Sequence, residues 1–463
     1  MHQAATEGPG GTATDDLNRV VVPRRVMSTA ITRLLAEFAL AAPDRRTRSV
    51  DAFWADVGRV GTPLIELVDD EPQHRDVTFV WRDRAATAVL VSFSGLPRSA
   101  PETGQLSRVD GTDIWYATFR LRSDHRSSYR FIVSGPDTVA DDRNLSRNRD
   151  VDPRRMKLSG QPDPFNSCRL PGRWGQPESS VFALPDAPAD PWLSPFGRSS
   201  HSERPSEHRP ADRSVVRHRV ESDRLGCERD VWVYRPPAAE QGTDPAVLVL
   251  CDGDRWFGEL QFQRVLDAAI DAGIVPPVIV LAPDAVDLDT RWQELSAHDP
   301  FVDFLADELL GNGLPAEASG RWSVTVDPAR TVIAGQSLGG LTALYAALTR
   351  PDRFGAVLAQ SASLWWKPGL PTGRPRAGDP RHCWLADRFA AADRLPAAVH
   401  LQAGLLEGDP VGGAPSSMVL RARRLRNVLQ ARGVQVSSYE FAGGHDYACW
   451  RSTLIDGLAR VLR

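Results

Sequence analysis

Residues 331–348 read TVIAGQSLGGLTALYAAL, and this stretch decides how the C-terminal part of the chain folds. A short apolar run ends at a glycine, a serine stands between further glycines, and a helical pattern follows at once. The letters GQSLG at 335–339 fit G-x-S-x-G, in which a serine sits at a strained strand-to-helix corner and the glycines let strand and helix approach. A structural glycine-rich turn is the alternative. The position between a buried strand and a helix favours Ser337 as a nucleophile.

A serine nucleophile needs a base, and the base needs an acid that orients it. In this fold the chain order is serine, acid, histidine, and His445 in FAGGHDYACW follows the last predicted strand. The preceding strand ends in HLQAGLLEGDP, which offers Glu407 and Asp409. We favour Glu407, with Asp409 second, although both could be solvated loop carboxylates. Asp446 adjoins His445 and would have difficulty reaching its far nitrogen.

An oxyanion needs two backbone donors near the serine. The N–H of Leu338 lies at the start of the predicted helix, where N–H groups have no acceptor in the helix and the dipole is positive. The second donor should come from the loop after an earlier strand, in CDGDRW at 251–256. Gly253 or Asp254 could supply it, and the sequence does not choose between them.

Residues 215–463 are predicted to form an α/β-hydrolase domain. AVLVLCDGD at 246–254 is a continuous apolar strand of the kind that is buried on both faces of a mostly parallel sheet. Further strands alternate with helical segments up to the C-terminus, which predicts a doubly wound α/β architecture.

Residues 27–193 show a different pattern and are predicted to form an Ig-like antiparallel β-sandwich that contacts the substrate. After a predicted helix at 27–42 and a helix and strand at 51–67, short aromatic and β-branched runs alternate with polar turns from about residue 76. Residues 1–26 are polar and small, so we expect a disordered tail. Residues 194–214 have almost nothing to bury and read as a linker.

The composition excludes several classes of function. The net charge of the 463 residues is −4, which argues against nucleic-acid binding. Five separated cysteines suit a reducing cytoplasm, and the ten histidines form no metal-binding motif, so no metal or cofactor is expected. The N-terminus has no signal-peptide pattern, and no apolar run approaches the ~18 residues of a membrane span. We therefore expect a cytoplasmic protein without membrane segments; its oligomeric state is left open.

With these pieces in place, the chain resembles the enterochelin (enterobactin) esterases over roughly residues 60–463. The similarity lies in VTFVWRD (77–83), TDIWYATFRL, SSYRFIV, DPFN (163–166), DGDRWF, RWQEL (291–295), AGQSLGGLTALYAAL, RFGAVLAQSASLWW, QAGLLE and GGHDYACWR. The family's catalytic serine, histidine and acid fall on Ser337, His445 and Glu407. Ala362 replaces an expected glycine and Leu338 a common aromatic residue, so the resemblance gives the class of siderophore but not its identity.

The resemblance implies a serine esterase that opens a cyclic trilactone of 2,3-dihydroxybenzoyl-serine in the cytoplasm so that iron is released. Fe(III) would enter only as part of this catecholate siderophore. The ferric complex is a trianion with exposed aromatic rings, for which guanidinium groups and tryptophan faces are natural partners.

The residues implied for substrate binding are charged and aromatic residues close to these motifs. They are Arg291, Glu294, Arg255, Trp256, Trp365, Trp366 and Trp81. For Arg291 and Glu294 the alternative is a buried ion pair that shapes their loop, and for each tryptophan it is a packing role.

Two other functions compete with this one. The first is a general carboxylesterase or acyltransferase acting on another ester, for which a secretion signal would have been an argument. The second is a siderophore-binding protein without catalysis, against which the Ser337 and His445 pair argues.

Overall fold

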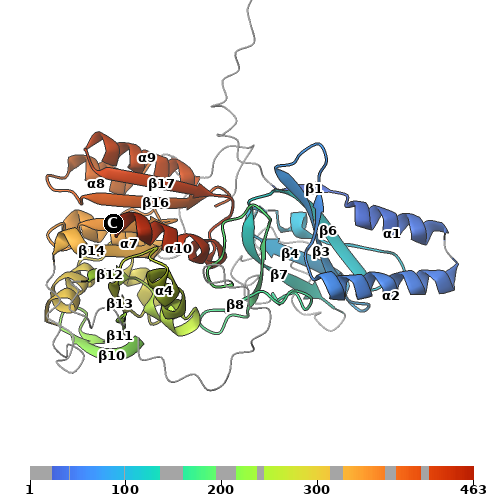
Figure 1. The fold of residues 1–463 in the computed structure, drawn as a ribbon, viewed down its shortest axis with the longest axis horizontal. Helices are drawn as coiled ribbons and strands as arrows, with labels where there is room; N and C mark the ends of the chain where they lie inside the picture. Colours follow the sequence, from blue (N-terminus) through green and yellow to red (C-terminus); the bar gives the residue numbers. More distant parts are fainter. Residues whose placement is uncertain are drawn as a thin grey trace, which may run out of the picture.

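The structure, a computed structural model, describes residues 23–40, 42–97, 100–135, 160–193, 215–236, 245–312, 327–370, 382–407 and 417–462. These residues form two parts of different architecture, an antiparallel β-rich part followed by an α/β part (Figure 1). The predicted two-part organisation with a C-terminal hydrolase architecture is therefore confirmed. The predicted linker at 194–214 lies outside the described residues.

The C-terminal part is built on an eight-stranded sheet of order β10-β11-β13-β12-β14-β15-β16-β17. β10 and β13 pair antiparallel with β11, and all other neighbours are parallel. The strands are β10 (Val215–Ser222), β11 (Cys227–Tyr234), β12 (Ala246–Leu250), β13 (Val278–Pro283), β14 (Thr331–Gln336), β15 (Ala356–Gln360), β16 (Ala398–Gly404) and β17 (Gln435–Phe441). The carboxyl ends of β14, β16 and β17 lie at one edge of the sheet, where the predicted site residues follow.

Helices cover both faces of this sheet, which is why its central strands are continuous apolar runs. Alternate strand residues enter two separate cores: Val247 and Val249 pack with α7, α8 and α9, while Leu248 and Leu250 pack with α4 and α10. The helices are α4 (Phe262–Asp271), α5 (Leu288–Glu294), α6 (Asp299–Asp303), α7 (Leu338–Thr349), α8 (Trp384–Ala391), α9 (Ser417–Ala431) and α10 (Tyr447–Val461), with the helical segments η6 (Asp254–Glu259), η7 (Phe304–Asn312) and η8 (Pro328–Arg330).

The N-terminal part is an antiparallel sandwich. One sheet has the order β1-β6-β3-β2 with β5 on β6, and the other has the order β4-β7-β9-β8. Their facing sides enclose an aromatic core that includes Phe79, Phe119, Tyr129 and Phe182. The strands are β1 (Arg24–Val26), β2 (Leu64–Leu67), β3 (His74–Arg82), β4 (Ala88–Phe93), β5 (Ser107–Arg108), β6 (Ile114–Arg122), β7 (Arg126–Ser134), β8 (Arg169–Leu170) and β9 (Ser179–Ala183), with the single turn η2 (Pro101–Gly104).

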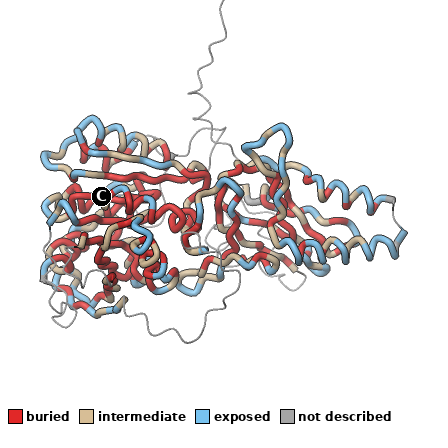
Figure 2. The backbone as a smooth tube through the Cα atoms, viewed as in Figure 1, coloured by how far each residue is buried: buried red, intermediate tan, exposed pale blue. Residues whose placement is uncertain are grey.

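Two helices, α1 (Thr29–Leu40) and α2 (Pro43–Val60), cover the outer face of the first sheet. Trp54 packs in this layer and donates its indole N–H to Asp113 at 2.9 Å. Figure 2 shows the exposed outer sides of both helices and the buried residues that face the sheet. Both helices and β2 confirm the pattern read at 27–67. The predicted tail is wrong at residues 24–26, which pair with β6; residues 1–22 lie outside the described residues.

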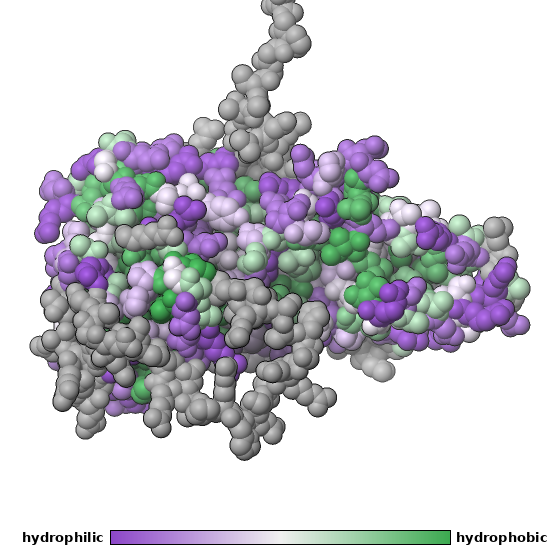
Figure 3. Space-filling view, viewed as in Figure 1, coloured by the Kyte–Doolittle hydropathy of each residue, from purple (hydrophilic) through white to green (hydrophobic). Residues whose placement is uncertain are grey.

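The two parts meet through a buried ion cluster. Asp190, which follows the sandwich strands, accepts hydrogen bonds from Arg126 of β7 at 3.0 Å and from Nε of Arg451 of α10 at 2.9 Å. On the face shown in Figure 3, hydrophilic residues are spread over both parts and visible apolar residues form separate groups. Within the ranges that the structure describes, every helix is too short or too polar to span a bilayer.

Candidate active site

Ser337 forms the corner between β14 and α7 in a conformation that few residues other than glycine adopt. Its φ is 59° and its ψ is −118°, a state that costs on the order of 1–3 kcal/mol and persists only where the surroundings enforce it. Strand and helix approach so closely here that a Cβ on Gly335 would lie 2.4 Å from the backbone of Gly339. The glycines of the motif therefore permit the corner on which Ser337 stands.

Ser337, His445 and Glu407 form one chain of hydrogen bonds. The Nε2 atom of His445 lies 2.8 Å from Oγ of Ser337, and its Nδ1 atom lies 3.0 Å from Oε2 of Glu407. The three residues follow β14, β17 and β16, so the sheet brings together residues that are up to 108 positions apart. Their order and distances are those of a serine hydrolase triad.

The side chain of Glu407 is held in place by hydrogen bonds to Oε1, the carboxylate oxygen that does not face His445. Its side chain is 1% exposed, and Oε1 accepts the backbone N–H of Gly404 at 2.6 Å and the hydroxyl of Ser361. A buried carboxylate held in this way keeps a single orientation, which leaves Oε2 for the imidazole. Asp409, the second candidate acid, lies outside the described residues.

The predicted oxyanion donors lie on the elements expected for them. Leu338 is the first residue of α7, so its N–H belongs to the turn that lacks intrahelical acceptors. Gly253 and Asp254 follow β12, where the loop runs so close to β13 that a Cβ on Gly253 would lie 2.1 Å from the carbonyl oxygen of Ala282. The choice between these two residues for the second donor stays a prediction.

A cavity of about 270 Å³ opens beside His445 and is walled by both parts of the protein. Its lining comes from β4 and the loop after it, from β7, from the turn between β8 and β9, and from the loops around Leu406 and His445. The lining residues are Val91, Ser92, Phe93, Ser94, Gly95, Leu96, Pro97, Ser128, Tyr129, Arg130, Leu170, Pro171, Gly172, Arg173, Gln176, Ser179, Arg255, Leu406, His445, Asp446 and Tyr447.

Comparison with known proteins accounts for both parts of the chain. The Enterochelin esterase N-terminal family model matches residues 76–193, and the Esterase family model matches residues 222–461. The iron(III) salmochelin esterase of Escherichia coli O6:H1 is 31% identical, over 88% of this chain and 92% of that relative. The chain belongs to the enterochelin esterase family. It is accordingly a carboxylic ester hydrolase.

Other members of the enterochelin esterase family are similar over the same length. The iron(III) enterobactin esterase of Dickeya dadantii is 30% identical, over 89% of this chain and 93% of its own. Among solved structures, the ferric enterobactin esterase of Salmonella typhimurium has a TM-score of 0.70 at 27% identity, covering 89% of this chain and 98% of its own. The enterobactin esterase of Shigella flexneri, solved in the presence of 2,3-dihydroxy-N-benzoyl-serine, has a TM-score of 0.66 at 26% identity, with 89% and 97% covered.

Arg291 of this enterochelin esterase does not pair with Glu294, so the alternative of an ion pair between these two residues is wrong. Arg291 binds both carboxylate oxygens of Asp252, at 2.6 and 2.8 Å, and Glu294 instead binds Arg229 at 2.6 and 2.7 Å. Both residues lie on the short helix α5, but their side chains bind different elements. Arg291 binds the aspartate that follows β12, and Glu294 binds an arginine of β11. Both are buried ion pairs, and neither Arg291 nor Glu294 is among the residues that line the described cavity.

The predictions for Arg255 and Trp256 have different outcomes. Arg255 lies in the cavity wall, but its guanidinium is bound to Glu259 and to the carbonyl of Pro171 and lies over the ring of Tyr447. Trp256 is 0% exposed and donates to Gln336 at 2.9 Å, so its predicted place in the pocket is wrong. Burying this indole fills the core under η6.

The remaining tryptophans lie elsewhere. Trp81 packs inside the sandwich against Phe131, at 5.1 Å between ring centroids, so its predicted place in the pocket is wrong. Trp365 and Trp366 are half-buried and pack against other tryptophans, and neither is among the described cavity's lining residues. The tryptophans at these positions pack in cores or against one another. A sequence alone does not distinguish an aromatic residue that packs in this way from one that contacts a ligand.

Sequence reasoning missed the cavity residues of the sandwich, notably Arg130, Ser128 and Arg173. Arg130 belongs to β7, where polar residues alternate with buried ones in SSYRFIV, and this alternation was the available signal. Arg173 lies in the glycine-rich turn LPGRWG, which has no catalytic pattern. In the part of the chain that the structure describes, no three His, Cys, Asp or Glu side chains gather to hold a metal ion.

Proposed function

We propose that this chain hydrolyses the ester bonds of a ferric tricatecholate trilactone siderophore and so releases iron in the cytoplasm. The observation that carries the proposal is the chain Ser337–His445–Glu407 beside a cavity walled by the sandwich as well as by the hydrolase part. Relatives named as esterases of iron(III) enterobactin and iron(III) salmochelin, similar over nearly the full length, support the choice of substrate.

In the first half of the reaction, Oγ of Ser337 attacks an ester carbonyl while Nε2 of His445 takes the hydroxyl proton. Glu407 holds the Nδ1 proton and stabilises the imidazolium that forms. The N–H of Leu338 and one from Gly253 or Asp254 receive the negative oxygen of the tetrahedral intermediate. When the intermediate collapses, the ester's serine oxygen leaves and takes the proton from His445, so the ring is opened and an acyl chain stays on Ser337.

In the second half, water takes the place of the leaving alcohol. His445 accepts a proton from this water, whose oxygen attacks the acyl carbonyl, and then returns the proton to Oγ of Ser337. The product is a linear chain with a free carboxylate. Because three catecholates on one ring hold Fe(III) at a high effective concentration, cutting the ring weakens the iron complex.

The cavity supports an anionic, partly aromatic ligand. Arg130 brings a positive charge to its wall, where it hydrogen-bonds Ser179 at 2.8 Å and the carbonyls of Glu178 and Pro177, and we propose it as a catecholate contact. At about 270 Å³ the cavity is small for a drug-sized ligand, which favours entry of one arm of the siderophore at a time. Fe(III) enters with the substrate, and no resident cofactor is required by this chemistry. We also propose that the sandwich is immunoglobulin-like.

Steady-state kinetics on two substrates tests the function. A short-chain chromogenic ester reports the triad alone, and a ferric trilactone reports the triad and the cavity together. We expect kcat/KM for the ferric trilactone to exceed that for the chromogenic ester. A general carboxylesterase would show the reverse order, and a siderophore-binding protein without catalysis would bind the ferric complex and hydrolyse neither.

A further inference from the structure

We infer that Arg173 is a positioning residue by which the sandwich holds the loop after β12, and through it the corner of Ser337, in the arrangement that the reaction needs. The inference rests on the proposed role of Ser337 as nucleophile. It makes the N-terminal part a component of the catalytic machinery for any ester, in addition to a wall of the cavity.

Arg173 projects from a tight turn between β8 and β9. The two central residues of the turn, Trp174 and Gly175, have φ values of 51° and 75°, and the N–H of Gln176 closes the turn on the carbonyl of Arg173 at 3.1 Å. Positive φ at both central positions is typical of a type I′ turn, which gives short hairpins a fixed twist. The guanidinium carbon of Arg173 also lies over the ring of Trp174, at 4.0 Å from the ring centroid.

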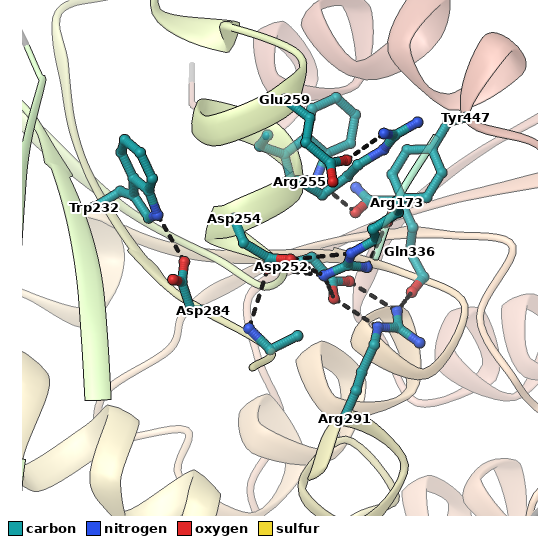
Figure 4. A network of polar contacts seen from close by, with 12 residues as sticks. Arg173, Trp232, Asp252, Asp254, Arg255, Glu259, Asp284, Arg291, Gln336 and Tyr447 are labelled. Carbon is teal, nitrogen blue, oxygen red and sulfur yellow. Dashed lines mark hydrogen bonds and ion pairs between the residues drawn. The ribbon is translucent and has the colours of Figure 1, made fainter. Parts of the chain in front are cut away.

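The guanidinium of Arg173 crosses to the hydrolase part and binds two carboxylates. It donates to Asp252 at 3.0 Å and to Asp254 at 2.8 and 3.0 Å. Figure 4 shows it in contact with both residues, which lie just after β12 at the start of η6. Asp254 in turn accepts the backbone N–H of Ala285 at 3.1 Å, which ties the loop after β13 to the same point.

Asp252 connects Arg173 to the corner of Ser337 through a second arginine. Its carboxylate is bound on the other side by Arg291, which also donates to the backbone carbonyl of Gln336 at 3.3 Å. Gln336 directly precedes Ser337, so four residues connect the sandwich turn to the catalytic corner (Figure 4).

The backbone at Asp252 needs such support. Its φ is 66°, a left-handed conformation that is unfavourable for a residue with a side chain. Burial would raise the pKa of Asp252, but Arg291 and Arg173 more than offset this and hold it well below its usual range. Two cations therefore keep this buried carboxylate charged and fixed in place, and the loop that carries Gly253 and Asp254 is held with it. Without Arg173, Asp252 loses one of the two cations that bind it. The lost cation is the one that comes from the sandwich.

Arg173 also lines the cavity, so a direct contact with substrate is the competing explanation. The two differ in what a small neutral ester would report. A catecholate contact affects only the anionic substrate, chiefly through KM, whereas a positioning residue affects kcat for every ester.

The test compares Arg173→Met, Arg173→Lys and a matched control, Arg120→Met, with the full-length protein. Arg120 also binds two carboxylates, Asp76 and Glu71, but within the sandwich. With a short-chain neutral ester we expect Arg173→Met to lower kcat about 10- to 100-fold with little change in KM, since small displacements at a reacting centre cost this much. Arg173→Lys should recover part of the loss, and Arg120→Met should stay within about twofold of wild type.

A second readout follows the reaction of Ser337 itself. The rate at which a neutral fluorophosphonate modifies the protein, measured by intact mass, should fall in Arg173→Met and partly recover in Arg173→Lys. If Arg173→Met does not fold, as shown by circular dichroism, the Lys variant carries the comparison. Unchanged kcat and unchanged phosphonylation, with KM raised only for the ferric siderophore, would overturn the inference and make Arg173 a substrate contact.

A double-mutant cycle with Asp252→Asn tests the route. If Arg173 acts through Asp252, the double variant should have the kcat of Asp252→Asn alone within about threefold. If the reductions in kcat of the two single variants multiply in the double variant, Arg173 does not act through Asp252. A wild-type protein that neither hydrolyses the neutral ester nor reacts with the fluorophosphonate would instead overturn the role of Ser337, and with it both the inference and the proposed function.

Discussion

The backbone N–H of Ser128 in the sandwich donates to Oδ2 of Asp446 at 2.5 Å, and Asp446 directly follows His445. The other carboxylate oxygen of Asp446 accepts the N–H of Ala448 and caps α10. Both oxygens of Asp446 are thus engaged away from His445, while Glu407 meets the imidazole. Asp446, the neighbour of the proposed base, is consequently held by the sandwich through one carboxylate oxygen and by α10 through the other.

Glu407→Gln should slow turnover about 10²- to 10⁴-fold, because a neutral amide does not stabilise the imidazolium of His445. Asp409→Asn is the matched control and should be far milder. Pre-steady-state and steady-state rates with a chromogenic ester measure both variants. The reverse order of effects would move the acid to Asp409.

Arg130→Met should raise KM for the ferric siderophore roughly 10- to 150-fold, because a charge-assisted contact is worth ~1.5–3 kcal/mol. KM for a neutral ester should stay unchanged. Binding of the ferric complex to the wild-type protein should weaken as salt is raised. Equal losses for both substrates would show that Arg130 supports the cavity wall and does not meet the catecholates.

Arg291→Met should reduce activity toward a neutral ester and a ferric siderophore by the same factor. Arg291 binds Asp252 and the carbonyl of Gln336, so its loss leaves a buried carboxylate with one cation fewer. Removing one member of a buried pair typically costs about 3–5 kcal/mol of stability, which thermal unfolding would detect. A loss confined to the ferric substrate would contradict this structural role.

The contribution of His125 to the stability of the protein should fall as the pH is lowered from about 6.5 to about 4. Burial lowers the pKa of His125 from 6.5 to about 4, against the opposing charges of Asp124 and Asp446. The unfolded chain therefore binds a proton in this window that the folded chain does not, so unfolding is favoured as pH falls. The difference corresponds to up to about 3 kcal/mol.

His125→Phe tests this origin of the pH dependence. The imidazole stacks on Phe182 at 5.3 Å, so a phenyl ring fits the same aromatic core without a titrating group. Chemical unfolding between pH 4 and pH 7 should show a shallower slope in the variant. An unchanged slope would assign the pH dependence to other groups.

The sequence predicted that Ser337, His445 and Glu407 would lie together, because these residues follow strands of a regular βα series. Ser337 at a strand-to-helix corner and His445 after the last strand are positions that the fold itself defines. Glu407 was favoured over Asp409 and Asp446, and the structure supplies the reason in the contacts of Oε1 and of the Asp446 carboxylate.

The residues that line the cavity were predicted poorly, because their positions depend on long-range packing. Arg291 and Glu294 are three residues apart on a helix, which suggests a pair, but Asp252 and Arg229 are the partners that the sheet brings to them. Trp256 and Trp81 are aromatic residues within family motifs, yet each fills a core. The cavity forms only where the sandwich packs against the hydrolase part, and no local sequence pattern predicts how these two parts pack.

Identification of the products from a ferric tricatecholate trilactone tests the central claim most directly. Mass spectrometry should show linear 2,3-dihydroxybenzoyl-serine oligomers with the wild-type protein, each ester cleaved adding one water. Ser337→Ala should lower their rate of formation about 10⁴- to 10⁶-fold while the ferric complex still binds. An intact trilactone after incubation with the wild-type protein, or cleavage by Ser337→Ala at more than about a tenth of the wild-type rate, would contradict the account.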